Sequence, residues 1–101
     1  MGQITWTVRA RSDLKAIRDY IAADNPTAAL AVARRLVASA ERLSDFAQSG
    51  RVVPEHEGSA VRELVVRPYR IAYRVVDNEV RILKIHHSAR MLRLSDIEES
   101  P

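Results

Sequence analysis

Cysteine is absent from this sequence of 101 residues, which excludes disulfide bonds, thiolate nucleophiles and cysteine-based zinc sites. The three glycines are never grouped as in a phosphate-binding loop, and no serine lies in the glycine-flanked turn of a hydrolase nucleophile. No apolar run approaches the ~20 residues of a membrane span, and the N-terminal residues lack the apolar core of a signal peptide. We therefore expect a cytoplasmic protein that needs no membrane and no cofactor.

A metal site is not expected either. His86 and His87 are consecutive, and consecutive strand residues point to opposite sides of a sheet, so one ion cannot easily take both. His56 lies between Glu55 and Glu57 in "PEHEG", a composition more typical of a solvated loop than of a ligand cluster.

Aromatic residues are also few, at 5% of the chain. Proteins that bind single-stranded nucleic acid usually stack several bases on aromatic side chains, so this scarcity weighs against general nucleic-acid binding. We expect Tyr20 and Phe46 to pack within helices and Tyr73 to lie in the core. Trp6 and Tyr69 are the aromatic residues expected to face a partner.

Hydrophobic residues make up 47% of the chain, which is enough for one domain over residues 1–101 near the lower size limit for a single core. Such a small domain leaves apolar surface for a partner, so a homodimer or a hetero-oligomer is expected. The net charge is +3, but cations concentrate in the C-terminal half, where few acids accompany them. That half should attract nucleic acid or an acidic protein. Its cations are Arg62, Arg67, Arg70, Arg74, Arg81, Lys84, Arg90 and Arg93, against Glu63, Asp77 and Glu79.

The N-terminal half predicts a strand followed by two helices. "QITWTV" (3–8) is β-branched and aromatic, as strands are. Ser12 is the predicted N-cap of a helix that runs to about Ala23, where "DNP" (24–26) ends it. A second helix follows at once, with Gly50 as a candidate C-cap, and the two form a hairpin. The apolar stripe of the second helix consists of Ala29, Val32, Leu36, Ala40 and Leu43.

After a loop at 49–59 the period changes to two, which predicts three strands at 61–67, 69–76 and 79–87. The turns fall at Pro68 and at Asp77-Asn78. If the turn at Asp77-Asn78 has two residues, Val76 pairs with Glu79 and an apolar face of the sheet lies toward the helices. A three-residue turn would invert the facing of side chains between the last two strands. The opposite face then carries Arg70, Ala72, Arg74, Arg81, Leu83, Ile85 and His87.

That second face is both basic and partly apolar. An antiparallel sheet with one face in water commonly displays arginine, so a solvated face is the alternative explanation for any single arginine. Arg74 opposite Arg81 is harder to explain in this way, because like charges opposed across strands destabilise a sheet by something like 0.2 to 1 kcal/mol. We therefore expect an anionic ligand on this face.

The order of features resembles the RelE/ParE superfamily of bacterial toxins, the toxic halves of type II toxin–antitoxin pairs. The matching pieces are Ala10, "DL" at 13–14, Ile17, "YIAADNPTAA" at 20–29, "GR" at 50–51, "RE" at 62–63, "YRIAYRV" at 69–75 and "HHSAR" at 86–90. The resemblance implies an α+β fold: an N-terminal strand, and a helical hairpin on one face of a twisted, mostly antiparallel sheet of three to four strands.

The superfamily has two branches with different targets. RelE-like members cut messenger RNA on the ribosome, ParE-like members poison DNA gyrase, and an antitoxin that lays an extended and helical segment across the toxin neutralises both. For a ribonuclease the resemblance points to Arg70 and Arg90, with Arg62 near a further basic position. RNA cleavage also needs a group to handle protons, and His87 could serve because imidazole titrates near neutral pH. The segment "MLRLSDIEESP" has no Tyr or His that would assist, and a strand-end His87 bonded to backbone or water is the alternative to a catalytic one.

We therefore predict a ParE-like toxin that binds gyrase and has no confidently assigned catalytic residue. The alternatives are a ribosome-dependent messenger RNA endonuclease and a non-toxic partner-binding module. Charge reversal at Arg70 should abolish toxicity with little effect on folding. Residues 93–101 are expected to form a short helix or a flexible tail. The predicted target-binding patch consists of Arg62, Arg70, Arg74, His87 and Arg90.

Overall fold

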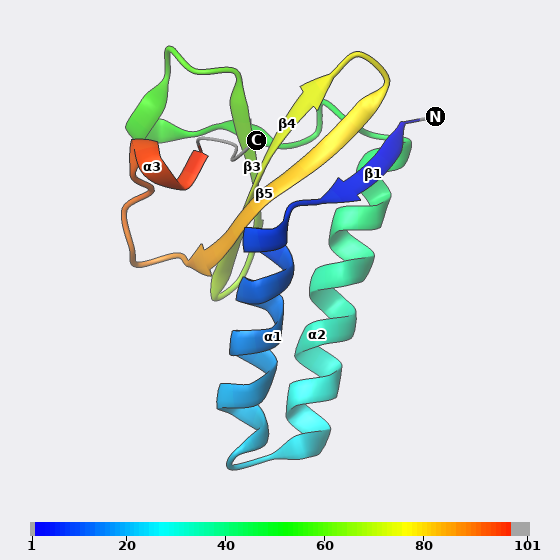
Figure 1. Ribbon diagram of the computed structural model, residues 1–101, viewed down its shortest axis with the longest axis vertical. Helices are drawn as coiled ribbons and strands as arrows, with labels where there is room; N and C mark the ends of the chain where they lie inside the picture. Colours follow the sequence, from blue (N-terminus) through cyan, green and yellow to red (C-terminus); the bar gives the residue numbers. More distant parts are fainter. Residues whose placement is uncertain (1, 98–101) are drawn as a thin grey trace.

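The computed structural model describes residues 2–97, in which one sheet carries two long helices on one face (Figure 1). The sheet has five strands in the order β1-β5-β4-β3-β2. Within residues 2–97 no helix is long and apolar enough to cross a membrane. The elements are β1 (Gln3–Trp6), α1 (Val8–Ala22), α2 (Pro26–Glu41), the 3-10 turn η1 (Arg42–Ser44), β2 (Arg51–Val52), the 3-10 turn η2 (Pro54–His56), β3 (Val61–Val66), β4 (Tyr69–Val76), β5 (Glu79–His87) and α3 (Leu94–Ile97).

This architecture confirms the predicted α+β fold, with two refinements. The sheet is mixed, because β1 pairs with β5 in parallel while all other neighbours are antiparallel. The two-residue strand β2 adds to the predicted count. α3 falls in the predicted tail, and residues 98–101 of that tail lie outside the described residues.

The first helix begins earlier than predicted. Thr7, not Ser12, is its N-cap: the Thr7 hydroxyl accepts a hydrogen bond from the Ala10 backbone N–H at 3.1 Å and donates one to the Leu83 carbonyl at 3.1 Å. The prediction failed because serine and threonine are both good caps, and only packing decides between them. Here the earlier start buries Ala10 completely in the core.

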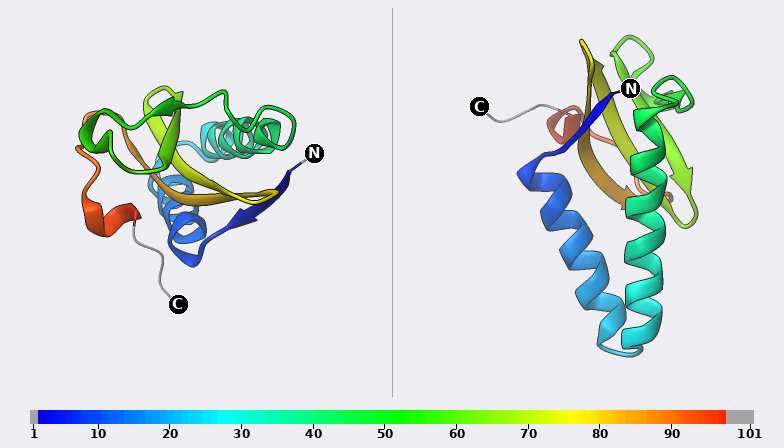
Figure 2. Two further views of the ribbon diagram at one scale, coloured as in Figure 1. Left: turned by 90° about the horizontal axis from the view of Figure 1, so that it is seen from above. Right: turned by 90° about the vertical axis from the view of Figure 1, so that its right-hand side faces the viewer.

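The second helix starts as predicted, with Asn25 as N-cap and Pro26 in the first turn. It ends at Glu41, so Gly50 is not its C-cap. Gly50 instead packs under Tyr73, whose hydroxyl accepts a hydrogen bond from the Gly50 N–H at 2.9 Å and donates one to the Ala47 carbonyl at 2.8 Å. Both helices continue past the strands, so the tip of the hairpin projects beyond the sheet (Figure 2).

The meander has the predicted two-residue turn, with Val76 paired to Glu79 and Asp77 at φ 56°. The last strand, however, contains a bulge: Tyr73 pairs with Ile82, but Ala72 pairs with Lys84. This extra residue reverses the predicted facing of residues 85–87, because side chains alternate along a strand. Ile85 therefore joins the core under the helices, where the sequence pattern had placed it on the opposite face.

Hydrophobic side chains fill both faces of the sheet. Ile71, Tyr73 and Ile82 pack against Leu36 and the rest of the hairpin in the main core. On the opposite face a smaller buried cluster joins the sheet to the β2–β3 connection and to the segment after β5. The face predicted to be an open basic surface is thus largely covered. The covering cluster consists of Val53, Val61, Ala72, Leu83 and Leu92.

Candidate functional site

The five predicted target-binding residues do not form one patch. Arg62 lies opposite Tyr73 of the neighbouring strand, on the face that carries the helices. Its Nη1 donates a hydrogen bond to the Gly50 carbonyl at 2.8 Å. Arg74 lies on the opposite face across from Arg81, as predicted. Arg81 is already bound to Glu79, with Nε to Oε1 at 3.0 Å, and neither arginine lacks a partner. The opposed arginines therefore do not require an external anion.

Arg70 is buried rather than displayed, with 6% of its surface exposed. Its Nη2 donates to Glu55 Oε1 at 2.7 Å, its Nε to Glu63 Oε2 at 2.6 Å, and its Nη1 to the Arg90 carbonyl at 3.2 Å. Arg51 completes the chain of charges by binding the other oxygen of Glu63 at 2.7 Å. The prediction of an arginine open to a ligand is wrong, because two carboxylates already neutralise it.

This buried network fixes the ionisation of its members. Hydrogen bonding from Arg70, together with a bond from the Leu92 N–H at 2.8 Å, lowers the pKa of Glu55 to about 2 against the opposing effect of burial. Hydrogen bonding to Glu55 and then to Glu63 raises the pKa of Arg70. Charge reversal at Arg70 would place three carboxylates together, so we expect it to destabilise the fold, contrary to the expectation from the sequence.

The same contacts hold the segment after β5 against the sheet. Glu55 binds the Leu92 N–H, and the His56 ring Nε2 lies 2.6 Å from the Leu92 carbonyl. Arg9 of α1 adds a bond to the Ser95 carbonyl at 2.5 Å. Residues 88–97 thus have a fixed path, which ends in α3 beside the β2–β3 connection (Figure 1).

A cleft of about 1020 Å³ lies between this segment and α1. It forms because β1 pairs with β5 only as far as Trp6 opposite Ile82, so among residues 2–97 no strand covers the later residues of β5 on that side. We name it the β5 cleft. Its lining residues are Asp13, Ala16, Ile17, Tyr20, Tyr69, Lys84, Ile85, His86, His87, Arg90, Met91, Arg93, Ser95 and Asp96.

Two of the five predicted residues, His87 and Arg90, meet in the β5 cleft. His87 was predicted to share a face with Arg70, and this is wrong. Because of the bulge His87 lies opposite Tyr69, and the two rings meet edge-on with centroids 6.0 Å apart. His86 takes the position opposite Arg70 instead. The sequence indicated that one of the two consecutive histidines lies on the same face as Arg70, because side chains alternate along a strand. The bulge that selects His86 is not indicated by the sequence pattern.

The β5 cleft is cationic. Arg90 and Arg93 are exposed, and Lys84 is partly exposed. The acidic residues of the lining already have partners within the protein: Asp13 accepts from the Ile85 N–H at 3.0 Å and lies 3.5 Å from Lys84 Nζ, and Asp96 accepts from the Arg93 N–H at 2.9 Å. Within residues 2–97 no three or more His, Asp or Glu side chains are grouped to hold a metal ion.

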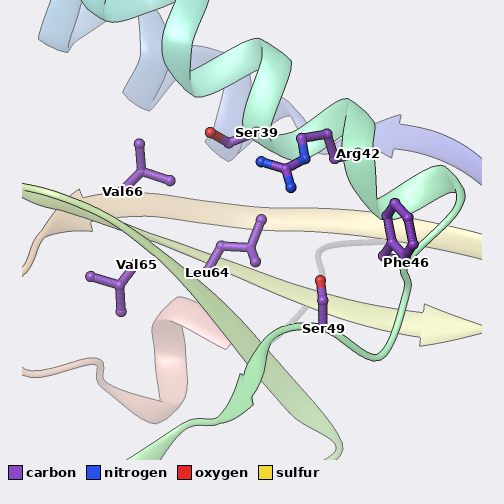
Figure 3. Close-up of a pocket in the computed structure, with 7 residues that line it drawn as sticks. All are labelled: Ser39, Arg42, Phe46, Ser49, Leu64, Val65 and Val66. Carbon is purple, nitrogen blue, oxygen red and sulfur yellow. The ribbon is translucent and has the colours of Figure 1, made fainter.

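A second, more apolar groove of about 410 Å³ lies between α2 and β3 (Figure 3). Leu64 and Val66 point from β3 toward the helix, with Ser39, Arg42 and Phe46 around them. β2 pairs only with Arg62 and Glu63, so no strand of the described residues covers β3 on this side from Leu64 on. We name this the α2–β3 groove.

The exposed aromatic residues differ from those predicted. Tyr20 is 82% exposed at the β5 cleft and Phe46 is 60% exposed at the α2–β3 groove, although both were expected to pack within helices. Trp6 is partly buried against the main core, and Tyr69 is partly buried while also lining the cleft. Helical spacing alone did not show that the hairpin extends past the sheet that would have covered Tyr20.

Comparisons with known proteins agree on the family. The model of the family described as "ParE toxin of type II toxin-antitoxin system, parDE" matches residues 4–92. "Toxin RelE2" of Caulobacter vibrioides is 45% identical over 92 residues, which are 90% of this chain and all of that protein. A solved structure titled "Chromosomal ParDE TA system from P. aeruginosa" superposes with a TM-score of 0.73 at 33% identity, covering 86% of this chain and 96% of that one. The chain therefore belongs to the ParE toxin family of type II toxin–antitoxin systems, within the RelE/ParE superfamily.

Proposed function

We propose that this toxin acts in the cytoplasm by binding DNA gyrase and not by cutting messenger RNA. The observation that carries the proposal is the enclosure of Arg70 between Glu55 and Glu63. In the ribonuclease branch, the resemblance assigns this position to an arginine that would serve the reacting phosphate. Here its donors are bound within the protein, so the side chain is a structural cation.

The remaining requirements of RNA cleavage are poorly met by the same residues. The reaction needs a proton acceptor, positive charge at the phosphorane and a proton donor for the leaving oxygen, all converging on one phosphate. His87 lies on the helix side of the sheet and Arg70 on the other, and Arg62 is also on the helix side. Docking on a protein requires no such convergence.

The β5 cleft is the surface we assign to the target. Arg90 and Arg93 are exposed there beside apolar groups such as Met91, which is 75% exposed. Cations next to exposed apolar area suit an acidic protein surface, since complementary charge speeds encounter while apolar contact slows release.

The α2–β3 groove is the surface we assign to the antitoxin. An extended peptide can hydrogen-bond to the uncovered edge of β3, and its apolar side chains can pack on Leu64, Val66 and Phe46. Arg42 at the rim favours an acidic or amphipathic segment. Target and antitoxin would then use separate surfaces.

The function is tested by expressing the toxin alone in bacteria and measuring plasmid supercoiling and message integrity in the same cells. We expect growth arrest with lost supercoiling and intact messages. Arg90→Glu should relieve the arrest, while Arg34→Glu, the same charge change at an exposed site on α2, should not. Early message cleavage with normal supercoiling would establish the ribonuclease alternative, and unchanged growth would favour a non-toxic binding module.

The antitoxin surface has its own test. Phe46→Glu should weaken neutralisation by the antitoxin and leave toxicity intact, because it places a charge in the apolar part of the α2–β3 groove. Val8→Glu is the matched control, since Val8 is 75% exposed and does not line that groove. Equal neutralisation of both variants would exclude the groove.

A further inference from the structure

His86 is a buried imidazole without a hydrogen-bond partner in the part of the chain that the structure describes. Only 6% of its surface is exposed, and neither ring nitrogen has a hydrogen-bond partner among residues 2–97. Buried polar side chains are nearly always hydrogen-bonded, because an unpaired one destabilises the fold. The residue opposite His86 on β4 is Arg70, whose side chain already donates hydrogen bonds to Glu55 and Glu63. The hydrogen-bond network around Arg70 therefore does not include the ring of His86.

His86 lines the β5 cleft, but both of its ring nitrogens are buried, so the ring must turn toward the cleft before a ligand there can bind it. Around it are the cations Lys84, Arg90 and Arg93, while Asp13 and Asp96 are already held by bonds within the protein. Lys84 is paired with Asp13, so an incoming anion would meet the exposed side chains of Arg90 and Arg93 at the mouth and the ring of His86 in the wall.

The surroundings of His86 favour the neutral form of its imidazole. Burial lowers the pKa of His86, and the nearby charge of Arg70 lowers it further. A neutral ring offers one N–H donor and one acceptor nitrogen. It can therefore donate to an anionic oxygen without adding a buried charge that would need its own partner.

We propose that the β5 cleft binds an aspartate or glutamate side chain of the target protein, with Arg90 pairing to the carboxylate and His86 donating a hydrogen bond to it. This rests on the proposed function in naming the target as a protein, and it adds a recognition residue and a ligand group. Residues flanking that carboxylate would be apolar, to match Ile17 and Met91 on the two walls of the cleft.

A protein ligand fits this cleft better than nucleic acid does. Stacking platforms for bases usually present several open aromatic faces. The cleft has Tyr20 and Tyr69 as its only tyrosines, and Tyr69 is partly buried with its ring against His87. The apolar walls instead resemble those that receive peptide side chains.

The first test uses the purified toxin with isotope-labelled histidine and two probe peptides, acetyl-Leu-Glu-Leu-amide and acetyl-Leu-Gln-Leu-amide. We expect the glutamate peptide to shift the ring resonances of His86 and the glutamine peptide to leave them unchanged. The shift should disappear in Arg90→Gln, a surface change, and persist in the control Arg34→Gln. A stronger response to inorganic phosphate or a short single-stranded RNA than to the glutamate peptide would overturn the proposal, as would no response at all.

The second test measures binding to purified DNA gyrase. His86→Phe should weaken binding about tenfold or more, the loss expected when a hydrogen bond to a charged group is removed. The same variant should melt at or above the wild-type temperature, because it removes an unpaired buried polar group, and His86→Gln should restore part of the binding. Wild-type affinity in both His86→Phe and Arg90→Gln would overturn the inference while leaving gyrase as the target. Failure of the wild-type toxin to bind gyrase, with the peptide response intact, would instead overturn the proposed function alone.

Discussion

Replacing Arg70 by methionine should destabilise the toxin severely, although arginines on strands of small sheets usually tolerate substitution. The side chain lies between two carboxylates, and that of Glu63 is completely buried. Methionine keeps much of the length and volume but removes the charge. Glu63 would then remain buried with Arg51 as its cation, and Glu55 would lose the partner that holds it against the sheet.

The size of the effect follows from what a broken buried ion pair costs, about 3–5 kcal/mol of the free energy of unfolding. That is a large share of the roughly 5–15 kcal/mol available to a typical domain. At about 4–8 °C per kcal/mol for a chain of this size, the melting temperature should fall by at least about 12 °C. The segment after β5 should loosen as well, since Arg70 also binds the Arg90 carbonyl.

Thermal unfolding followed by circular dichroism measures this directly. Arg90→Met is the matched control, because Arg90 is exposed and its side chain should be worth less than about 0.5 kcal/mol to the fold. The triple variant Arg70→Met, Glu55→Gln, Glu63→Gln should regain much of the lost stability, because it removes the stranded charges together with their partner. If Arg70→Met melts within about 2 °C of the wild type, the buried network does not support the fold and the reasoning is wrong.

The other predictions concern the acid limb of stability and the packing around Tyr73. Hydrogen bonding from Arg70 lowers the pKa of Glu55 from 4.5 in the unfolded chain to about 2 in the folded protein. The carboxylate therefore adds about 3 kcal/mol to the free energy of unfolding above pH 4.5, and this contribution is lost as the pH falls toward 2. Urea unfolding of Glu55→Gln should lack this decline, and parallel pH profiles of the variant and the wild type would contradict the prediction. Gly50→Ala should destabilise strongly, since its Cβ would lie 2.4 Å from the Tyr73 hydroxyl and 2.8 Å from the Glu63 carbonyl, whereas Gly58→Ala meets nothing within 4 Å; equal melting temperatures would refute this close approach. Tyr73→Phe should cost about 1–3 kcal/mol by leaving the Gly50 N–H unpaired, and an unchanged urea midpoint would show that this bond contributes nothing.

Much of the fold was predictable because hydrophobic period and turn chemistry are local. The stripe from Ala29 to Leu43, the break at Pro26 and the turn at Asp77 each depend on a few neighbouring residues, and each was confirmed. The family followed from the order of short motifs, and the comparisons confirm it.

The site was harder to predict because its chemistry depends on contacts between residues far apart in sequence. Glu55 lies in the short turn η2, 15 residues from Arg70, and no periodicity indicates that its carboxylate binds an arginine of a strand. The bulge at Leu83 adds a single residue, yet it exchanges His86 and His87 between the faces. A cluster of arginines in sequence therefore indicated positive charge without showing which members were already neutralised.

The most direct test of how this toxin acts is supercoiling of relaxed plasmid by purified DNA gyrase in the presence of the purified toxin. We predict inhibition by the wild type, loss of inhibition in Arg90→Glu and retention in Arg34→Glu, with messages on purified ribosomes left intact by all three. Full gyrase activity at saturating wild-type toxin, together with cleavage of a ribosome-bound message, would contradict a mechanism of binding through the β5 cleft.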